Sequence, residues 1–181
     1  MVAPETWGFV DFDGARIAAV AGEVADAAGL AVPLRIEVDE TTPNGRVQVV
    51  SYEPVVIRVE SGAFEDAKRP RHLSERSVAD VLGRLLLRIR DRLDPGFGNP
   101  PDDGELTLQE STAWDAYAVG RAERLGFPAQ RRRRLYHFRN RHGFTDVADE
   151  VFDRLWTADG LTWCDIRAAC EEAAAGRRAM A

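Results

Sequence analysis

The sequence has few of the features that mark secreted or membrane proteins. It contains only two cysteines, Cys164 and Cys170. They stand six positions apart on a predicted helix and point to different sides of it, so a disulfide between them is not expected. No apolar run approaches the roughly 18 residues of a membrane span, and residues 1–8 show no basic and apolar leader pattern. We therefore expect a cytoplasmic protein that does not enter a membrane.

Lysine is also nearly absent, because Lys68 is the only one among 24 basic residues. The 30 aspartates and glutamates give a formal net charge of −6. This balance argues against a surface that binds nucleic acid or anionic membranes over its whole area, although a local basic patch remains compatible with it. Hydrophobic residues make up 45% and charged residues 30%, which is ordinary globular usage and excludes collagen-like, disulfide-scaffold and disordered chains.

Apolar spacing predicts an α+β fold in which one helix and three strands precede five helices. The expected strands are residues 34–38, 46–52 and 54–60, and the expected helices are residues 14–29, 78–93, 107–125, 128–141, 145–156 and 162–176. The N-terminal helix and a sheet of three or slightly more strands should pack on the long core helix 78–93, with a helical C-terminal half docked on them.

Turn residues predict how these elements connect. Pro43-Asn44-Gly45 favours a hairpin between the first two strands. The third strand is apolar on both faces, which predicts a place in the middle of the sheet with Pro54 as its first residue. Residues 61–73 are polar and should cross the surface as a connection. We expect a single domain over residues 1–181, with a candidate internal boundary at 95–106 between an α/β part, 1–94, and a helical part, 107–178.

The order of elements over residues 14–126 resembles the zincin-like metallopeptidases. The helix after the core helix also carries the run A-x-D-A-Y-A-V. In zincins the core helix carries H-E-x-x-H, which supplies two zinc ligands and a glutamate general base. This chain has Arg84-Leu-Leu-Leu-Arg88 in that frame, and Ser111 stands four residues before Asp115, where the family has a glutamate ligand, with Glu110 one place off. The resemblance therefore implies a zincin-like scaffold that has lost its metal.

No other motif predicts a catalytic, cofactor or metal site. His137 and His142 are five positions apart and diverge by about 140° on a helix, so they do not form a ligand pair. Nucleotide-binding glycine motifs and G-x-S-x-G are absent. Glu110 is explained as the partner of Thr107 in a capping box. A hydrolase with an unrecognised site around Glu110, Asp115, His137 and His142 stays as a third hypothesis, behind two non-catalytic ones.

The sharpest local feature is a helix with six arginines. Its candidate partner-binding residues are Arg131, Arg132, Arg133, Arg134, Tyr136, Arg139 and Arg141. Arginines interleaved with aromatic rings are typical of surfaces that contact phosphates and stack on bases. The competing interpretation is structural, with a buried stripe of Leu135, Phe138 and His142, and with arginines paired to acidic residues of the next helix, namely Asp146, Asp149, Glu150 and Asp153.

Four consecutive arginines extend around the helix, so some must face solvent or a partner. We therefore expect a non-catalytic interaction or regulatory domain, without cofactor or metal, that binds a protein partner partly through this helix. The alternative is an accessory protein that binds nucleic acid with residues 130–142. The flanking arginines Arg84 and Arg88 of the core helix are expected to lie at its rim, with their stems over apolar neighbours.

Overall fold

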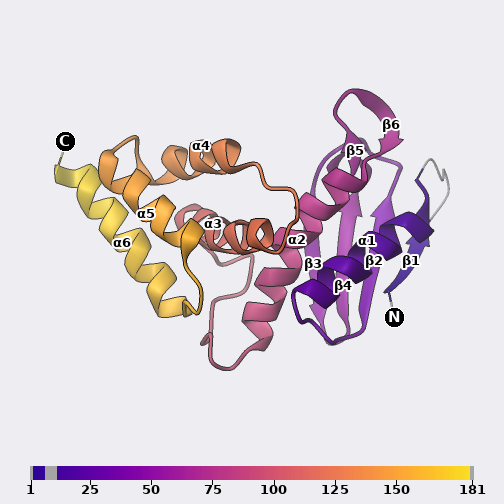
Figure 1. Ribbon diagram of the computed structural model, residues 1–181, viewed down its shortest axis with the longest axis horizontal. Coiled ribbons are helices and arrows are strands. Elements are labelled where there is room, and N and C mark those ends of the chain that lie inside the picture. Colours follow the sequence, from indigo (N-terminus) through magenta and orange to yellow (C-terminus); the bar gives the residue numbers. More distant parts are fainter. Residues whose placement is uncertain (1, 7–11, 180–181) are drawn as a thin grey trace. The chain divides into compact units, whose positions relative to one another are not determined.

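The computed structural model describes residues 2–6 and 12–179 and confirms the α+β class (Figure 1). The chain divides into two compact units, Met1–Leu86 and Leu87–Ala181. The division falls inside the long helix α2, Glu75–Leu93, and the candidate boundary at 95–106 lies within the second unit. The single-domain organisation stays a prediction.

The first unit consists of a helix, a sheet and a short additional ribbon. Its elements before α2 are β1 (Val2–Thr6), α1 (Gly14–Ala27), β2 (Leu34–Asp39), β3 (Val47–Tyr52), β4 (Val55–Glu60), the 3₁₀ turn η1 (Ser61–Ala63), β5 (Glu65–Asp66) and β6 (Arg69–Leu73). The expected helix at 14–29 is confirmed as α1. It begins at the N-cap Asp13, whose side chain accepts a hydrogen bond from the backbone N–H of Ala15 at 2.9 Å.

The main sheet has four strands in the order β1-β2-β4-β3. β1, β2 and β4 run parallel, whereas β3 is antiparallel to β4. The central position of β4 is confirmed, but the expected hairpin between the first two predicted strands is wrong. β3 instead forms a hairpin with β4 across Glu53 and Pro54, because a two-residue connection suits antiparallel neighbours. The segment expected as a surface connection contains the small β5–β6 sheet.

One face of the sheet belongs to the core. Leu34, Ile36 and Val38 of β2 alternate with exposed or partly exposed residues, and Ile36 lies beside Ile57 of β4 in register. The opposite face is polar, and there the Arg58 guanidinium contacts the Glu37 carboxylate at 3.0 Å. This one-sided burial explains the alternating pattern of β2. α1 lies across the strands (Figure 1).

The second unit contains the end of α2 and four further helices: α3 (Leu108–Arg124), α4 (Arg131–His142), α5 (Asp146–Thr157) and α6 (Trp163–Ala179). The five helices expected after the strands are thus confirmed. Helix α4 begins three residues later than expected, at Arg131 instead of Pro128. None of the helices in the described part of the chain is long and apolar enough to cross a membrane.

Helix α3 forms the centre of the second unit and contacts α4, α5 and α6. Its N-terminus is the expected capping box, in which Thr107 Oγ1 accepts from the Glu110 N–H at 3.1 Å and Glu110 Oε2 accepts from the Thr107 N–H at 2.9 Å. At Gly120 the backbones of α3 and α5 approach so closely that a Cβ atom would lie 2.0 Å from the carbonyl oxygen of Trp156. Glycine is therefore required there.

Candidate functional site

The arginines of α4 divide into a paired and an unpaired set. On the side toward α5, Arg131 contacts Asp153 at 2.5 Å and Arg139 forms two short hydrogen bonds with Asp149. These are two of the carboxylates that the sequence offers as partners. Hydrogen bonding from the Arg139 guanidinium, aided by its charge, holds the pKa of Asp149 below its usual value. The structural interpretation of the helix is therefore correct for these arginines.

The predicted buried stripe of α4 is also confirmed. Phe138 and His142 are buried, and Leu135 is partly buried against the same core. His142 stacks on Phe138 with ring centroids 3.9 Å apart, and its Nε2 donates to the Gln109 carbonyl at 3.1 Å. Burial lowers the pKa of His142 to about 4, so the ring is neutral near pH 7. It therefore serves as a core residue.

The rest of the surface of α4 is exposed and cationic. Arg132, Arg133 and Arg141 are exposed and make no ion pair with any described residue. Tyr136 is 58% exposed and Phe144, which follows the helix, is 63% exposed, with ring centroids 6.2 Å apart. We call Arg132, Arg133, Tyr136 and Phe144 the arginine–aromatic surface.

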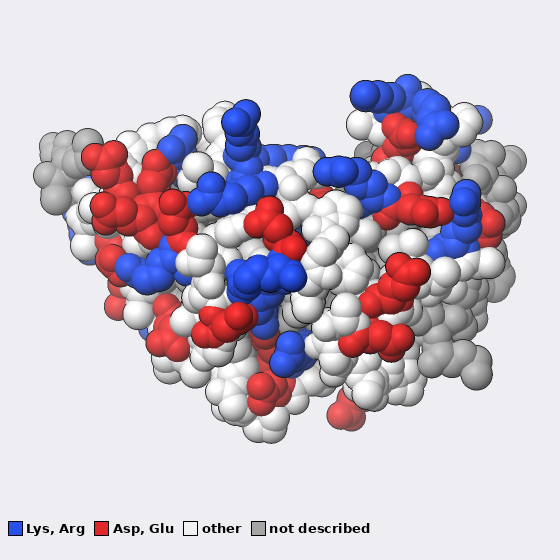
Figure 2. Space-filling model, viewed as in Figure 1, with Lys and Arg blue, Asp and Glu red and all other residues white. Residues whose placement is uncertain are grey.

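Figure 2 shows blue side chains over α4 beside red ones over α5. The sequence predicted Arg132, Arg133 and Tyr136 as binding residues but missed Phe144. The sequence signal for Phe144 was its position as a large apolar residue immediately after Gly143, the glycine that ends the helix.

A pocket of about 220 Å³ lies between α3 and α4. Helical spacing aligns its lining residues on one face of each helix: Leu108, Ser111, Thr112 and Asp115 on α3, and Arg134, His137 and Arg141 on α4. We call this cavity the α3–α4 pocket. It brings together Arg134 and Arg141, two of the predicted binding residues, with hydroxyl groups that the sequence did not associate with them.

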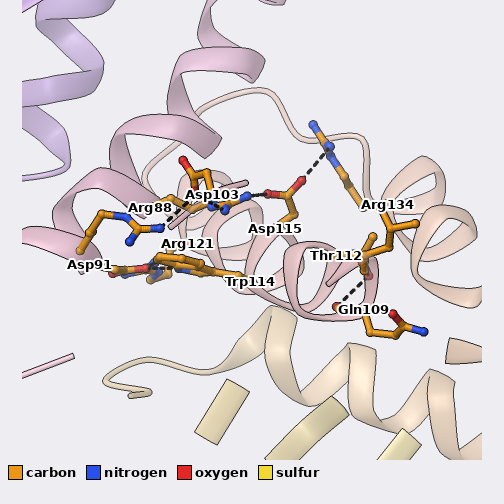
Figure 3. Close-up of polar contacts among 11 residues, drawn as sticks. Arg88, Asp91, Asp103, Gln109, Thr112, Trp114, Asp115, Arg121 and Arg134 are labelled. Carbon is orange, nitrogen blue, oxygen red and sulfur yellow. Dashed lines mark hydrogen bonds and ion pairs between the residues drawn. The ribbon is translucent and has the colours of Figure 1, made fainter. Parts of the chain in front are cut away.

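Asp115 in the wall of the α3–α4 pocket lies between two arginines (Figure 3). Arg88 of α2 donates to Asp115 at 2.8 Å, and Arg134 lies 3.8 Å from its other carboxylate oxygen. Arg88 also contacts Asp103 at 3.0 Å, and its guanidinium lies 4.5 Å from the ring centroid of Trp114. The Arg88 side chain is only 11% exposed.

The expectation that Arg88 lies at the rim with its head in water is therefore wrong. Two carboxylates and an aromatic face stabilise its charge inside the fold.

The arginines of α4 also act on His137. The pKa of His137 is lowered, first by partial burial and then by the charges of Arg133, Arg134 and Arg141, whereas Asp115 raises it. Partial burial is thus the main cause of the shift, and the charges of the three arginines add to it by disfavouring the imidazolium.

The residues of the hydrolase hypothesis have other roles in the structure. Glu110 belongs to the capping box, His142 is held neutral in the core, and Asp115 is ion-paired. Ser111 and His137 line one pocket, but no hydrogen bond joins them in the described part of the chain. The arrangement thus lacks the base-to-nucleophile contact that covalent catalysis uses.

The cysteines and the metal-ligating side chains of the described residues do not form a reactive site. Cys164 and Cys170 are both free. Burial, with nearby Glu110 and Glu171, raises the pKa of Cys170 to about 12, so its thiol stays protonated and is a poor nucleophile or ligand. Among residues 2–6 and 12–179, no group of three or more histidine, cysteine, aspartate or glutamate side chains is placed to hold a metal ion. The chain matches no protein-family model, no curated protein and no solved structure.

Proposed function

We propose that this chain is a non-catalytic interaction domain of the cytoplasm whose second unit binds an acidic segment of a partner protein. The observation that carries the proposal is the arginine–aromatic surface. Arg132 and Arg133 have no carboxylate partner within the described chain, although Arg131 and Arg139 of the same helix do. An acidic partner segment would supply the missing carboxylates.

The exposed rings strengthen this proposal. Tyrosine, phenylalanine and arginine are enriched in the cores of protein interfaces, where a few aromatic and arginine side chains carry most of the binding energy. Tyr136 and Phe144 lie in edge-to-face contact and leave more than half of their surfaces open to solvent. The preferred partner segment therefore combines acidic residues with at least one apolar side chain.

The pairing of the α4 arginines, more than the net charge, favours a short acidic segment over a nucleic acid as the partner. The second unit contains 15 arginines and 16 acidic residues, so most of the net negative charge belongs to the first unit. Total charge is thus no strong argument against a phosphate backbone. The stronger argument is that Arg131, Arg134 and Arg139, half of the six arginines of α4, already contact carboxylates, so few cations of the helix are left for a phosphate backbone.

The test is a binding titration of the full chain with a fluorescent peptide of alternating acidic and leucine residues. Replacing Arg132 and Arg133 together with glutamine should weaken binding at least about tenfold, because two charge-assisted contacts are lost. The matched control replaces Arg90 and Arg167, which are exposed on α2 and α6, with glutamine and should leave affinity within about twofold. Equal losses of affinity in the two double variants would show that only net charge matters and would refute the arginine–aromatic surface as the binding site.

The same titration with single-stranded and duplex oligonucleotides tests the alternative function, which is binding of a nucleic acid. We expect only weak binding, near the roughly 10⁻⁴ M end of nonspecific association. A submicromolar complex at physiological salt, whose log affinity falls with log salt by about 0.9 per phosphate on duplex DNA, would overturn the proposal in favour of a nucleic-acid-binding accessory protein.

The zincin resemblance remains part of the proposal as an ancestral scaffold without metal. Arg88 stands at the position of the second histidine, and its guanidinium contacts Asp115 at 2.8 Å. A permanent cation thus already neutralises this carboxylate, and leucine replaces the general base at position 85. These substitutions support a binding role in place of the hydrolytic one.

A further inference from the structure

The α3–α4 pocket adjoins the arginine–aromatic surface. Arg133 belongs to that surface and His137 to the pocket, and the two are one helical turn apart on α4. A partner segment lying on Arg132 and Arg133 can therefore place one of its side chains in the pocket.

The size of the pocket limits what that side chain is. Its volume of about 220 Å³ is smaller than the roughly 300–1,000 Å³ of cavities that enclose drug-sized ligands. The pocket suits a single terminal group, not a nucleotide or a cofactor.

The lining is suited to an anion with several oxygen atoms. Arg141 is exposed at the rim without an ion-pair partner among the described residues, and Arg134 lies deeper, with a side chain that is 19% exposed. The Ser111 hydroxyl makes no hydrogen bond in the described part of the chain, whereas the Thr112 hydroxyl already donates to the Leu108 carbonyl at 2.9 Å.

Asp115 is the one acidic residue of the lining, and its charge is countered from outside the pocket. Arg88 approaches Asp115 to 2.8 Å from α2 and is not itself a lining residue. The lining itself carries two arginines, Arg134 and Arg141, against this one carboxylate, and Arg141 makes no ion pair with a described residue.

We propose that the α3–α4 pocket binds the phosphomonoester of a phosphorylated serine or threonine in the acidic partner segment. The proposal rests on the function proposed above. A phosphomonoester carries nearly two negative charges and three acceptor oxygens near pH 7, so Arg134, Arg141 and the Ser111 hydroxyl can each contact one oxygen. A carboxylate offers only one charge and two oxygens.

The first test compares three versions of the acidic peptide with serine, phosphoserine or glutamate, with the modified position moved along the peptide. At the best position, phosphoserine should increase affinity at least about tenfold over serine, and glutamate should give less than half of that gain in log affinity. Arg141→Gln should abolish the gain and Ser111→Ala should reduce it. Arg90→Gln is the control and should preserve it, because Arg90 lies outside the pocket and the surface.

A second test uses phenyl phosphate alone and follows the His137 ring by NMR. Bound phosphate should raise the pKa of His137, because a nearby dianion stabilises the imidazolium, and Arg141→Gln should remove this rise. Benzoate serves as the monoanionic comparison and should have a smaller effect.

The outcomes separate this proposal from the previous one. One outcome is that the unmodified peptide binds through Arg132 and Arg133 while phosphoserine adds no affinity and phenyl phosphate leaves the pKa of His137 unchanged. That result refutes the pocket assignment and leaves the arginine–aromatic surface as the binding site. If phenyl phosphate binds as tightly as the phosphopeptide, the partner segment contributes nothing to recognition and the assignment to a phosphorylated segment is wrong. If no acidic peptide binds in either form, both proposals fail.

Discussion

The buried ion pair between α2 and α3 allows the sharpest prediction about stability. Both oxygens of Asp91 accept from the Arg121 guanidinium, at 2.7 and 2.6 Å, and Oδ2 also accepts from Trp114 Nε1 at 2.8 Å. The two charged side chains are only 6% and 10% exposed. These hydrogen bonds offset the cost of removing the two charges from water. Removing either partner alone therefore leaves a buried charge without compensation.

We expect Asp91→Asn and Arg121→Met each to lower the free energy of unfolding by about 3–5 kcal/mol. The double variant contains neither charge, and its asparagine oxygen can still accept from Trp114. It should lose no more than about 2 kcal/mol, the scale of one imperfect buried hydrogen bond. The coupling energy between the two positions should then be at least about 4 kcal/mol.

Urea unfolding followed by tryptophan fluorescence measures these differences, because three of the four tryptophans belong to the second unit. Asp153→Asn is the control, since its pair with Arg131 has the same chemistry but is 59% and 45% exposed on the two sides. This variant should lose less than about 1 kcal/mol. Losses below about 1 kcal/mol for both buried variants, or a double variant as unstable as the sum of the two single ones, would refute the reasoning.

Four further predictions follow from burial, close approach, titration and metal content. Leu85→Ala and Leu86→Ala should each cost about 2–5 kcal/mol in urea melts, because both side chains are buried in α2, and losses below about 1 kcal/mol would contradict its central place. Gly120→Ala should destabilise by at least about 2 kcal/mol, although helix propensity alone favours alanine, because the new Cβ would lie 2.0 Å from the Trp156 carbonyl; a gain in stability would refute the close approach. As the pH falls from 6.5 toward 4, the unfolded chain takes up a proton at His142 that the folded chain does not, since burial lowers its folded pKa to about 4. Stability should therefore fall by at most about 3 kcal/mol over this range, and a comparison with His142→Gln, whose slope should be flatter, measures that contribution. Purified protein should contain less than stoichiometric zinc by elemental analysis, and one zinc per chain that survives a weak chelator would contradict the metal-free scaffold.

Local signals in the sequence predicted the helices and their caps well. Thr107 and Glu110 form the predicted capping box, and Gly126 follows α3 with a positive φ of 91°. These features depend on residues within one helical turn of each other, so adjacent sequence contains most of the information. Strand pairing depends on distant segments. The parallel contact of β2 with β4 and the strand β1 beside it were therefore not recognised.

Six arginines around an apolar stripe are already visible in the sequence of α4, whereas the packing of the helices sets which of these arginines a partner can reach. Asp153, which contacts Arg131, is 22 residues away, and Asp115, one of the two carboxylates that contact Arg88, is 27 residues away. Helical spacing sets the direction of each side chain, whereas the packing of α3, α4 and α5 determines which charge it meets. The same packing leaves Arg132 and Arg133 exposed and forms an open pocket between α3 and α4.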